Sequence, residues 1–267
     1  MHWAKLRRGQ LDAFDRNTPV VLPVAAVEQH GDHLPLGTDC LINDAICDQL
    51  DQAFDGRLLI LPLQQVGCSE HHMVFPGSLT LTHETFRQAV SDVAESVVRH
   101  GFSRLLVLNS HGGNQAINGV IGEQIGQRFP QVECLVANWW SVARTGLANL
   151  QAGPLGSVGH ACEFETSLML AIAPELVDMA QASDGGIQHR VASLHFDMLH
   201  APVAQCYRPF DKLSHNGVFG RASLASVQKG RQILETTVAA LAELIAEFWG
   251  LPPKHERNYK ESSAENA

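Results

Sequence analysis

The densest group of potential metal ligands in this sequence lies in residues 28–39, which read EQHGDHLPLGTD. They directly follow an apolar run, residues 20–27, that predicts a buried β-strand. Because alternate residues of a strand face the same way, Glu28 and His30 can point into one pocket, and the loop after them can bring Asp39 over it. Two carboxylates and an imidazole so placed suit a hydrolytic divalent-metal site. A capped turn with a solvated charge cluster is the alternative.

A second cluster, NSHGGN at residues 109–114, follows another apolar run at residues 104–108. Its glycines permit a tight turn and close approach of a ligand, and His111 is well placed to bind a metal. The segment lacks the spacing of a phosphate-binding loop. The alternative is a turn histidine whose ring is satisfied by the backbone.

A third cluster, GHACEFETS at residues 159–167, lies where a helix is expected to begin. His160 would lie at the mouth of that helix. Glu163 and Glu165 are two positions apart and diverge on a helix, so we expect one of them to face the pocket. Alternatively, both are ordinary carboxylates of a helix N-terminus and His160 is a capping-region residue.

Weaker signals for chemistry come from residues 68–72, which read CSEHH. Ser69 could donate a hydrogen bond to a substrate carbonyl, and His71 or His72 could line the mouth of the site. Paired histidines also occur on surface loops. Serine-triad chemistry is disfavoured because no G-x-S-x-G motif is present.

The six cysteines are scattered, without a C-x-x-C pair, and are expected to be reduced and mostly buried. Cys162, next to His160, leaves open a thiol hydrolase as a rival function.

Composition excludes several classes of function. The net charge is −9, with no basic stripe to bind nucleic acid. No apolar run is long enough to span a membrane, and no secretory signal opens the sequence, so a cytoplasmic protein is expected.

Apolar runs alternate with helical patterns along the chain, which predicts an α/β fold: a mostly parallel β-sheet with helices on both faces. We expect a single domain at residues 1–252, an irregular stretch at 182–219, and a polar, disordered tail at 253–267. The other expected elements are strands at 57–63, 102–108 and 132–138 and helices at 44–53, 82–100, 115–129, 163–173 and 223–249.

Four motifs, in this order, resemble the creatininase (creatinine amidohydrolase) family over residues 15–250. They are ExHGxHLPxxTD at 28–39, SxxHxxFPG at 69–77, NxHGGN at 109–114 and GHAxxxETS at 159–167. The resemblance implies a single α/β domain, two divalent metal ions, hydrolysis of an amide C–N bond in a small molecule, and a homo-oligomer, commonly a hexamer.

By the same resemblance, Glu28, Asp39 and His111 would hold one metal ion. His30 and Asp39 would hold the second, with Asp39 bridging the two. His160 matches the histidine thought to relay protons in the family.

The sequence departs from creatininase at one metal ligand. In creatininase a glutamate two residues after the motif histidine completes the second site, and here that position is Gly113. We expect Glu165 to replace it, with Glu163 as the second candidate. This departure also keeps open a metal-free binding or assembly protein that retains the fold.

The substrate is left open. Creatininase covers creatinine with a tryptophan in the loop just before the histidine that His160 matches, and residues 155–158 here contain none. Trp139 and Trp140 could offer a stacking surface or could be packing residues. We expect a cyclic amide or a formamide, hydrolysed with zinc or, alternatively, manganese or iron.

Overall fold

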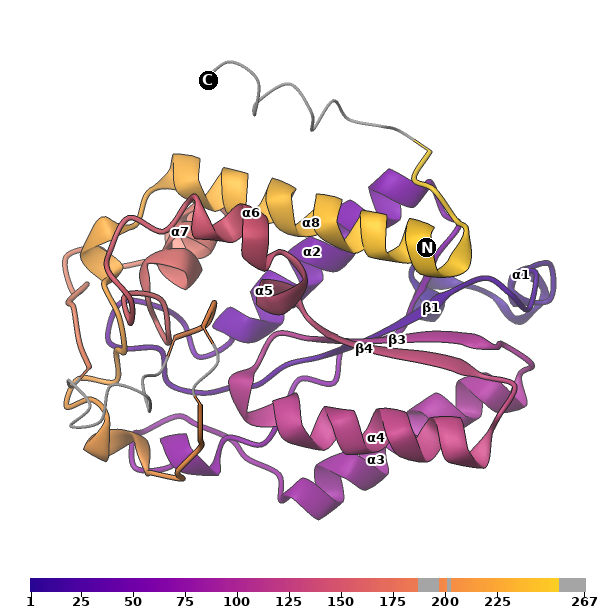
Figure 1. Ribbon diagram of the computed structural model, residues 1–267, viewed down its shortest axis with the longest axis horizontal. Coiled ribbons are helices and arrows are strands. Elements are labelled where there is room, and N and C mark those ends of the chain that lie inside the picture. Colours follow the sequence, from indigo (N-terminus) through magenta and orange to yellow (C-terminus); the bar gives the residue numbers. More distant parts are fainter. Residues whose placement is uncertain (187–196, 201–202, 255–267) are drawn as a thin grey trace.

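A computed structural model of the protein describes residues 1–186, 197–200 and 203–254. At its centre is a four-stranded parallel sheet in the order β2-β1-β3-β4 (Figure 1). The strands are β1 (Val20–Val24), β2 (Leu59–Ile60), β3 (Arg104–Asn109) and β4 (Glu133–Asn138).

Helices cover both faces of the sheet (Figure 1). On one face lie α3 (His83–Arg99) and α4 (Gln115–Arg128). On the other lie α2 (Thr38–Phe54), α5 (Trp139–Val142), α6 (Arg144–Ala148), α7 (Glu163–Ile172) and α8 (Val227–Trp249). A four-residue helix, α1 (Arg8–Leu11), and 3-10 turns at Trp3–Lys5, Glu70–His72, Gly112–Asn114, Pro174–Leu176, Phe210–Lys212 and Ala222–Leu224 complete the described elements.

The two hydrophobic cores follow from the alternation of side chains along the strands. In β3, Leu106 and Leu108 belong to the core beneath α2, α7 and α8, whereas Leu105 and Val107 belong to the core beneath α3 and α4. Both faces are therefore buried, as a continuous apolar strand requires. The predicted α/β class with a single domain is confirmed.

One boundary that matters for the site differs from the prediction. Helix α2 begins at Thr38 and not at Asp44, so Asp39 lies in a helical first turn and not in a loop. The hydroxyl of Thr38 donates to the carbonyl of Pro35 at 2.7 Å, which stabilises this turn. A carboxylate there also interacts favourably with the positive end of the helix dipole.

Other differences are smaller. The expected strand at 57–63 shortens to two paired residues at the sheet edge, and the short helices α5 and α6 were not predicted. Helix α8 begins at Val227, after Ser226, whose hydroxyl caps the helix by accepting from the Lys229 amide. Residues 187–196 and 201–202 of the expected irregular stretch, and residues 255–267 of the expected tail, lie outside the described residues. The boundary at 252 stays a prediction.

None of the helices in the described ranges combines the length and the apolar character needed to cross a bilayer.

Close packing of α8 on α7 gives a test of the fold. A Cβ on Gly230 would lie 1.8 Å from the carbonyl oxygen of Ser167, whereas a Cβ on Gly126 of α4 would have open space. We expect Gly230→Ala to lower the free energy of unfolding by about 1–3 kcal/mol, because backbone must move. The control Gly126→Ala should raise it by roughly 0.5–1 kcal/mol. Urea unfolding, monitored by circular dichroism, measures the free energy of unfolding of each variant. Equal changes in the two variants would contradict the close packing of α8 on α7.

Candidate metal centre

The three sequence clusters converge at the carboxyl edge of the sheet. Glu28 follows β1, His111 follows β3, Asp39 lies in the first turn of α2, and Glu165 lies in the first turn of α7. All four side chains are buried, as is that of His30. The parallel sheet explains the convergence, since the carboxyl ends of its strands share one edge.

His111 lies between two carboxylates. Its Nδ1 is 3.3 Å from Glu28 Oε1 and 3.2 Å from Asp39 Oδ2. Its other ring nitrogen, Nε2, is 3.1 Å from the backbone carbonyl of Cys68, which can only accept. In the neutral ring the proton therefore sits on Nε2, and the lone pair of Nδ1 faces the carboxylates.

His30 repeats this arrangement. Its Nδ1 donates to the backbone carbonyl of Glu28 at 3.1 Å, so the lone pair is on Nε2. Nε2 lies 3.3 Å from Asp39 Oδ1 and 4.0 Å from Glu165 Oε1.

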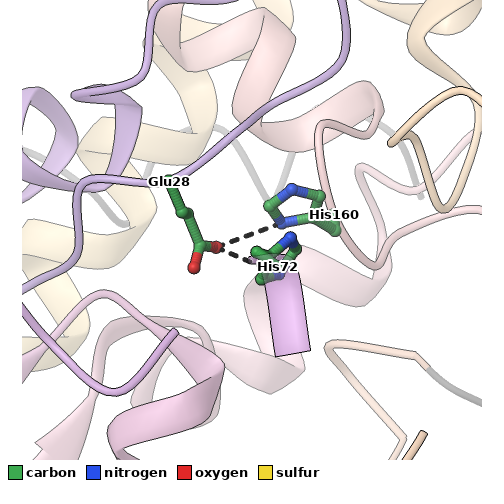
Figure 2. A group of neighbouring side chains, drawn as sticks. All are labelled: Glu28, His72 and His160. Atoms are coloured by element: carbon green, nitrogen blue, oxygen red, sulfur yellow. Dashed lines mark ion pairs between the residues drawn. The ribbon is translucent and has the colours of Figure 1, made fainter. Parts of the chain in front are cut away.

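His160 is the third ring of this kind. Its Nε2 donates to the backbone carbonyl of Gln29 at 2.7 Å, and its Nδ1 faces Glu28 Oε1 at 3.5 Å (Figure 2). In all three rings a backbone carbonyl holds one nitrogen and thereby aims the other at the cluster, which is how metal-binding histidines such as His30 and His111 would be supported.

His72 differs from these three rings, because its protonated nitrogen faces the carboxylate. The side chain of Gln29 sets this arrangement. The Gln29 oxygen accepts from the Gly31 amide, so its NH2 group donates to His72 Nδ1 at 2.9 Å and to the carbonyl of Gly217 at 3.1 Å. The proton of His72 is then on Nε2, which points at Glu28 Oε1 from 3.4 Å (Figure 2). His72 thus presents an N–H, and not a lone pair, to this carboxylate.

Several polar atoms at the centre of the cluster have no hydrogen-bond partner. Among the described residues these include Glu28 Oε2, His30 Nε2 and Asp39 Oδ2. Leaving such buried groups unsatisfied costs about 1–3 kcal/mol each, and more for charged ones. Carboxylate oxygens and imidazole nitrogens are the ligands of catalytic zinc and related ions, and sets of three such atoms here lie within 4.8 Å of one another. The donor set therefore fits divalent metal.

Without metal, protons must neutralise the cluster. Burial opposes charge on His30, but the carboxylates of Asp39, Glu165 and Glu28 outweigh it and raise its pKa to about 9. The pKa of His111 is likewise raised, against burial, by Glu28 and Asp39. Burial raises the pKa of Glu165 to about 7 and, together with the neighbouring His30, lowers that of His160 to about 3.

The pKa values of Glu28 and Asp39 shift the other way. Burial alone would raise both, but the histidines facing each carboxylate lower its pKa. These two residues are anionic at neutral pH, which suits them to hold a cation.

The two glutamates of the third cluster separate. Glu165 reaches the cluster beside His30, whereas Glu163 turns away to pair with Lys229 at 3.1 Å and to accept from the Ala152 amide. At Gly113, an added Cβ would lie 2.2 Å from the Cys68 carbonyl oxygen and 2.4 Å from His111 Nε2. No side chain fits there, so a ligand from position 113 is sterically excluded in this backbone.

The cluster opens into a cavity of about 440 Å³, whose lining includes His71, His72 and His160. Ser69 is buried beside it, with its hydroxyl 3.3 Å from His111 Nε2. Trp139, one of the two candidate stacking surfaces, packs in the hydrophobic core together with Trp140, and of the two only Trp140 also lines the cavity.

Cys162 is fully buried and does not line the cavity, and burial followed by the charge of Glu165 raises the pKa of its thiol. A thiolate nucleophile is therefore disfavoured, which removes the support for a thiol hydrolase.

Sequence reasoning missed the role of Gln29 and gave His72 no more weight than His71. The SxxHxxFPG motif carried a usable signal, because its histidine is His72. Sequence reasoning also missed two arginines that line the cavity, Arg144 and Arg208.

Comparison with known proteins decides the family. The family model "Creatininase: Creatinine amidohydrolase" matches residues 1–245. The chain belongs to the creatininase family. It is 30% identical over 243 residues to a creatinine amidohydrolase of Pseudomonas putida, covering 85% of this chain and 88% of that one.

Two further relatives show the range of the family. A mycofactocin precursor peptide peptidase of Mycobacterium ulcerans (strain Agy99) is 29% identical over 237 residues, covering 86% of this chain and 85% of its own. A solved mutant creatininase of the Zn-Zn type superposes with a TM-score of 0.76 at 27% identity, covering 94% of this chain and 98% of its own. Family and cluster together confirm the expected class, a metal-dependent amidohydrolase.

Metal binding should be strongly pH-dependent. Protons on His30, with a pKa of about 9, and on Glu165, with a pKa of about 7, must leave before these residues can bind a cation. Affinity should therefore rise with pH from about 6 to about 8, by roughly tenfold or more per unit, with proton release.

Calorimetric zinc titration of metal-free protein measures the zinc affinity at each pH. Repeating it in buffers of different ionisation enthalpy gives the number of protons released. The surface variant His100→Gln should release as many protons as wild type. A pH-independent affinity without proton release would contradict the assignment.

Proposed function

We propose that the protein hydrolyses the C–N bond of a small-molecule amide with two divalent metal ions. Glu28, Asp39 and His111 would hold one ion, and His30, Asp39 and Glu165 the other, with Asp39 bridging. The observation that carries this proposal is the convergence of buried, unpartnered carboxylate and imidazole atoms described above. Ions bound there would polarise the scissile carbonyl and lower the pKa of water.

Glu165 is proposed in place of the ligand that creatininase takes from the position of Gly113. Two features support it: Glu165 Oε1 lies 4.0 Å from His30 Nε2, and the backbone leaves no room for a side chain at Gly113. Glu163 is engaged by Lys229 and is not proposed. This assignment removes the basis of the metal-free alternative, because α7 would supply the carboxylate that position 113 lacks.

His160 is the proposed proton carrier. Its Nε2 is held by the Gln29 carbonyl, so Nδ1 is free to accept the proton of the attacking water and deliver it to the leaving nitrogen. His72 would help to orient Glu28, because its Nε2 lies 3.4 Å from Glu28 Oε1. Ser69 would act through His111, which it contacts, and His71 would form part of the cavity wall near the substrate.

A cavity of about 440 Å³ suits a small molecule, and we propose a cyclic amide or a formamide as the substrate. Zinc is the first choice of metal, with manganese or iron as alternatives, because mixed nitrogen and oxygen ligands suit all three. We also propose a cytoplasmic homo-oligomer, a hexamer by resemblance to the family.

Asp39→Asn tests the mechanism most severely, because this carboxylate contacts both His30 and His111. We expect it to lower kcat/KM by roughly 100-fold or more on whichever cyclic amide or formamide a substrate panel identifies. Chelator should abolish wild-type activity, and thiol alkylation should not.

The matched control is Asp44→Asn, an exposed carboxylate of the same helix, which should behave as wild type. Full activity and full metal content in Asp39→Asn would contradict the proposal, as would chelator-resistant hydrolysis.

A further inference from the structure

One wall of the cavity is built by the chain that follows β4. This strand ends at Asn138, on the same edge of the sheet as the metal centre, and α5 and α6 follow at once. Trp140, Ser141 and Arg144 from this segment line the cavity. The wall thus combines an aromatic ring, a hydroxyl and a guanidinium.

Arg144 and Arg208, which also lines the cavity, make no ion pair or hydrogen bond with any residue in the described part of the chain. Some arginines have acidic partners, such as Arg87 with Glu84, and others on the described surface, such as Arg231, have none; Arg144 and Arg208 are the two that line the cavity. In a chain with a net charge of −9, these two exposed arginines give the wall of one cavity a local positive charge.

The carboxylates of the cavity do not neutralise these arginines. Asp197 is fully buried and already accepts from the amides of Gly156, Leu199 and His200 and contacts the ring of His200. Glu28, Asp39 and Glu165 are committed to the metal centre, where three negative charges do not fully balance two divalent ions. A cleft with cations and a low-dielectric wall concentrates anions.

We propose that Arg144 binds an anionic group of the substrate, a carboxylate or a phosphate, at the end remote from the scissile amide. This inference rests on the proposed function and narrows its substrate class to anionic amides. A guanidinium binds either group with two parallel hydrogen bonds, which explains an arginine at this position. Arg144 is chosen over Arg208 because it extends from a helix anchored by buried Leu147.

The test uses inhibitors that share a metal-binding hydroxamate and differ in their tails. Acetohydroxamate is neutral, malonomonohydroxamate carries a carboxylate, and phosphonoacetohydroxamate carries a phosphonate. Binding to zinc-loaded protein is measured by calorimetry, so the readout does not depend on turnover. We expect one or both anionic tails to tighten binding about tenfold over the neutral tail, and the stronger of the two identifies the group.

Arg144→Gln should reduce this preference to within about twofold, whereas Arg231→Gln, an exposed arginine of α8 outside the cavity, should leave it unchanged. Equal binding of all three inhibitors to wild type would overturn the inference. So would a preference that survives Arg144→Gln, including one that disappears only in Arg208→Gln. Failure of the protein to bind metal would instead overturn the proposed function.

Discussion

Unpaired negative charge, buried at the carboxyl edge of the sheet, is the constraint on which the rest of this structure depends. Glu28, Asp39 and Glu165 are at most 5% exposed, yet atoms of the first two have no hydrogen-bond partner among the described residues. Burying a carboxylate without compensation is expensive, so a cation must balance the cluster. Without metal, raised pKa values let His30 and His111 carry that charge as protons.

The surrounding backbone fixes the tautomers of His30 and His111, the proposed metal ligands, and of His160, the proposed proton carrier. The carbonyls of Glu28, Cys68 and Gln29 each hold one ring nitrogen, and in every case the other nitrogen faces the carboxylates. Fixing the tautomers in this way removes part of the ordering cost of binding. The Gln29 side chain donates to the Nδ1 of His72, so this ring presents its protonated nitrogen to the carboxylate where the other three present a lone pair, and neighbouring rings of similar burial have different chemical roles.

The sequence predicted most of the fold and the location of the site, because both follow from local patterns. Apolar runs such as residues 104–108 indicated buried strands, and polar clusters after them indicated the edge where chemistry occurs. It did not predict that Asp39 lies on α2, because the helix start depends on the turn formed with Pro35. Nor could it predict which of Trp139 and Trp140 reaches the cavity, because the rotation of a four-residue helix is set by tertiary packing.

The direct test of the account's central claim is the metal content of each chain, measured by mass spectrometry on protein purified without chelator. Wild type should hold about two divalent ions, and Glu165→Gln about one. Glu175→Gln, which alters an exposed carboxylate just after α7, should match wild type. A wild-type protein that holds no metal, even after zinc or manganese is added, would contradict the account, as would a Glu165→Gln variant that retains both ions.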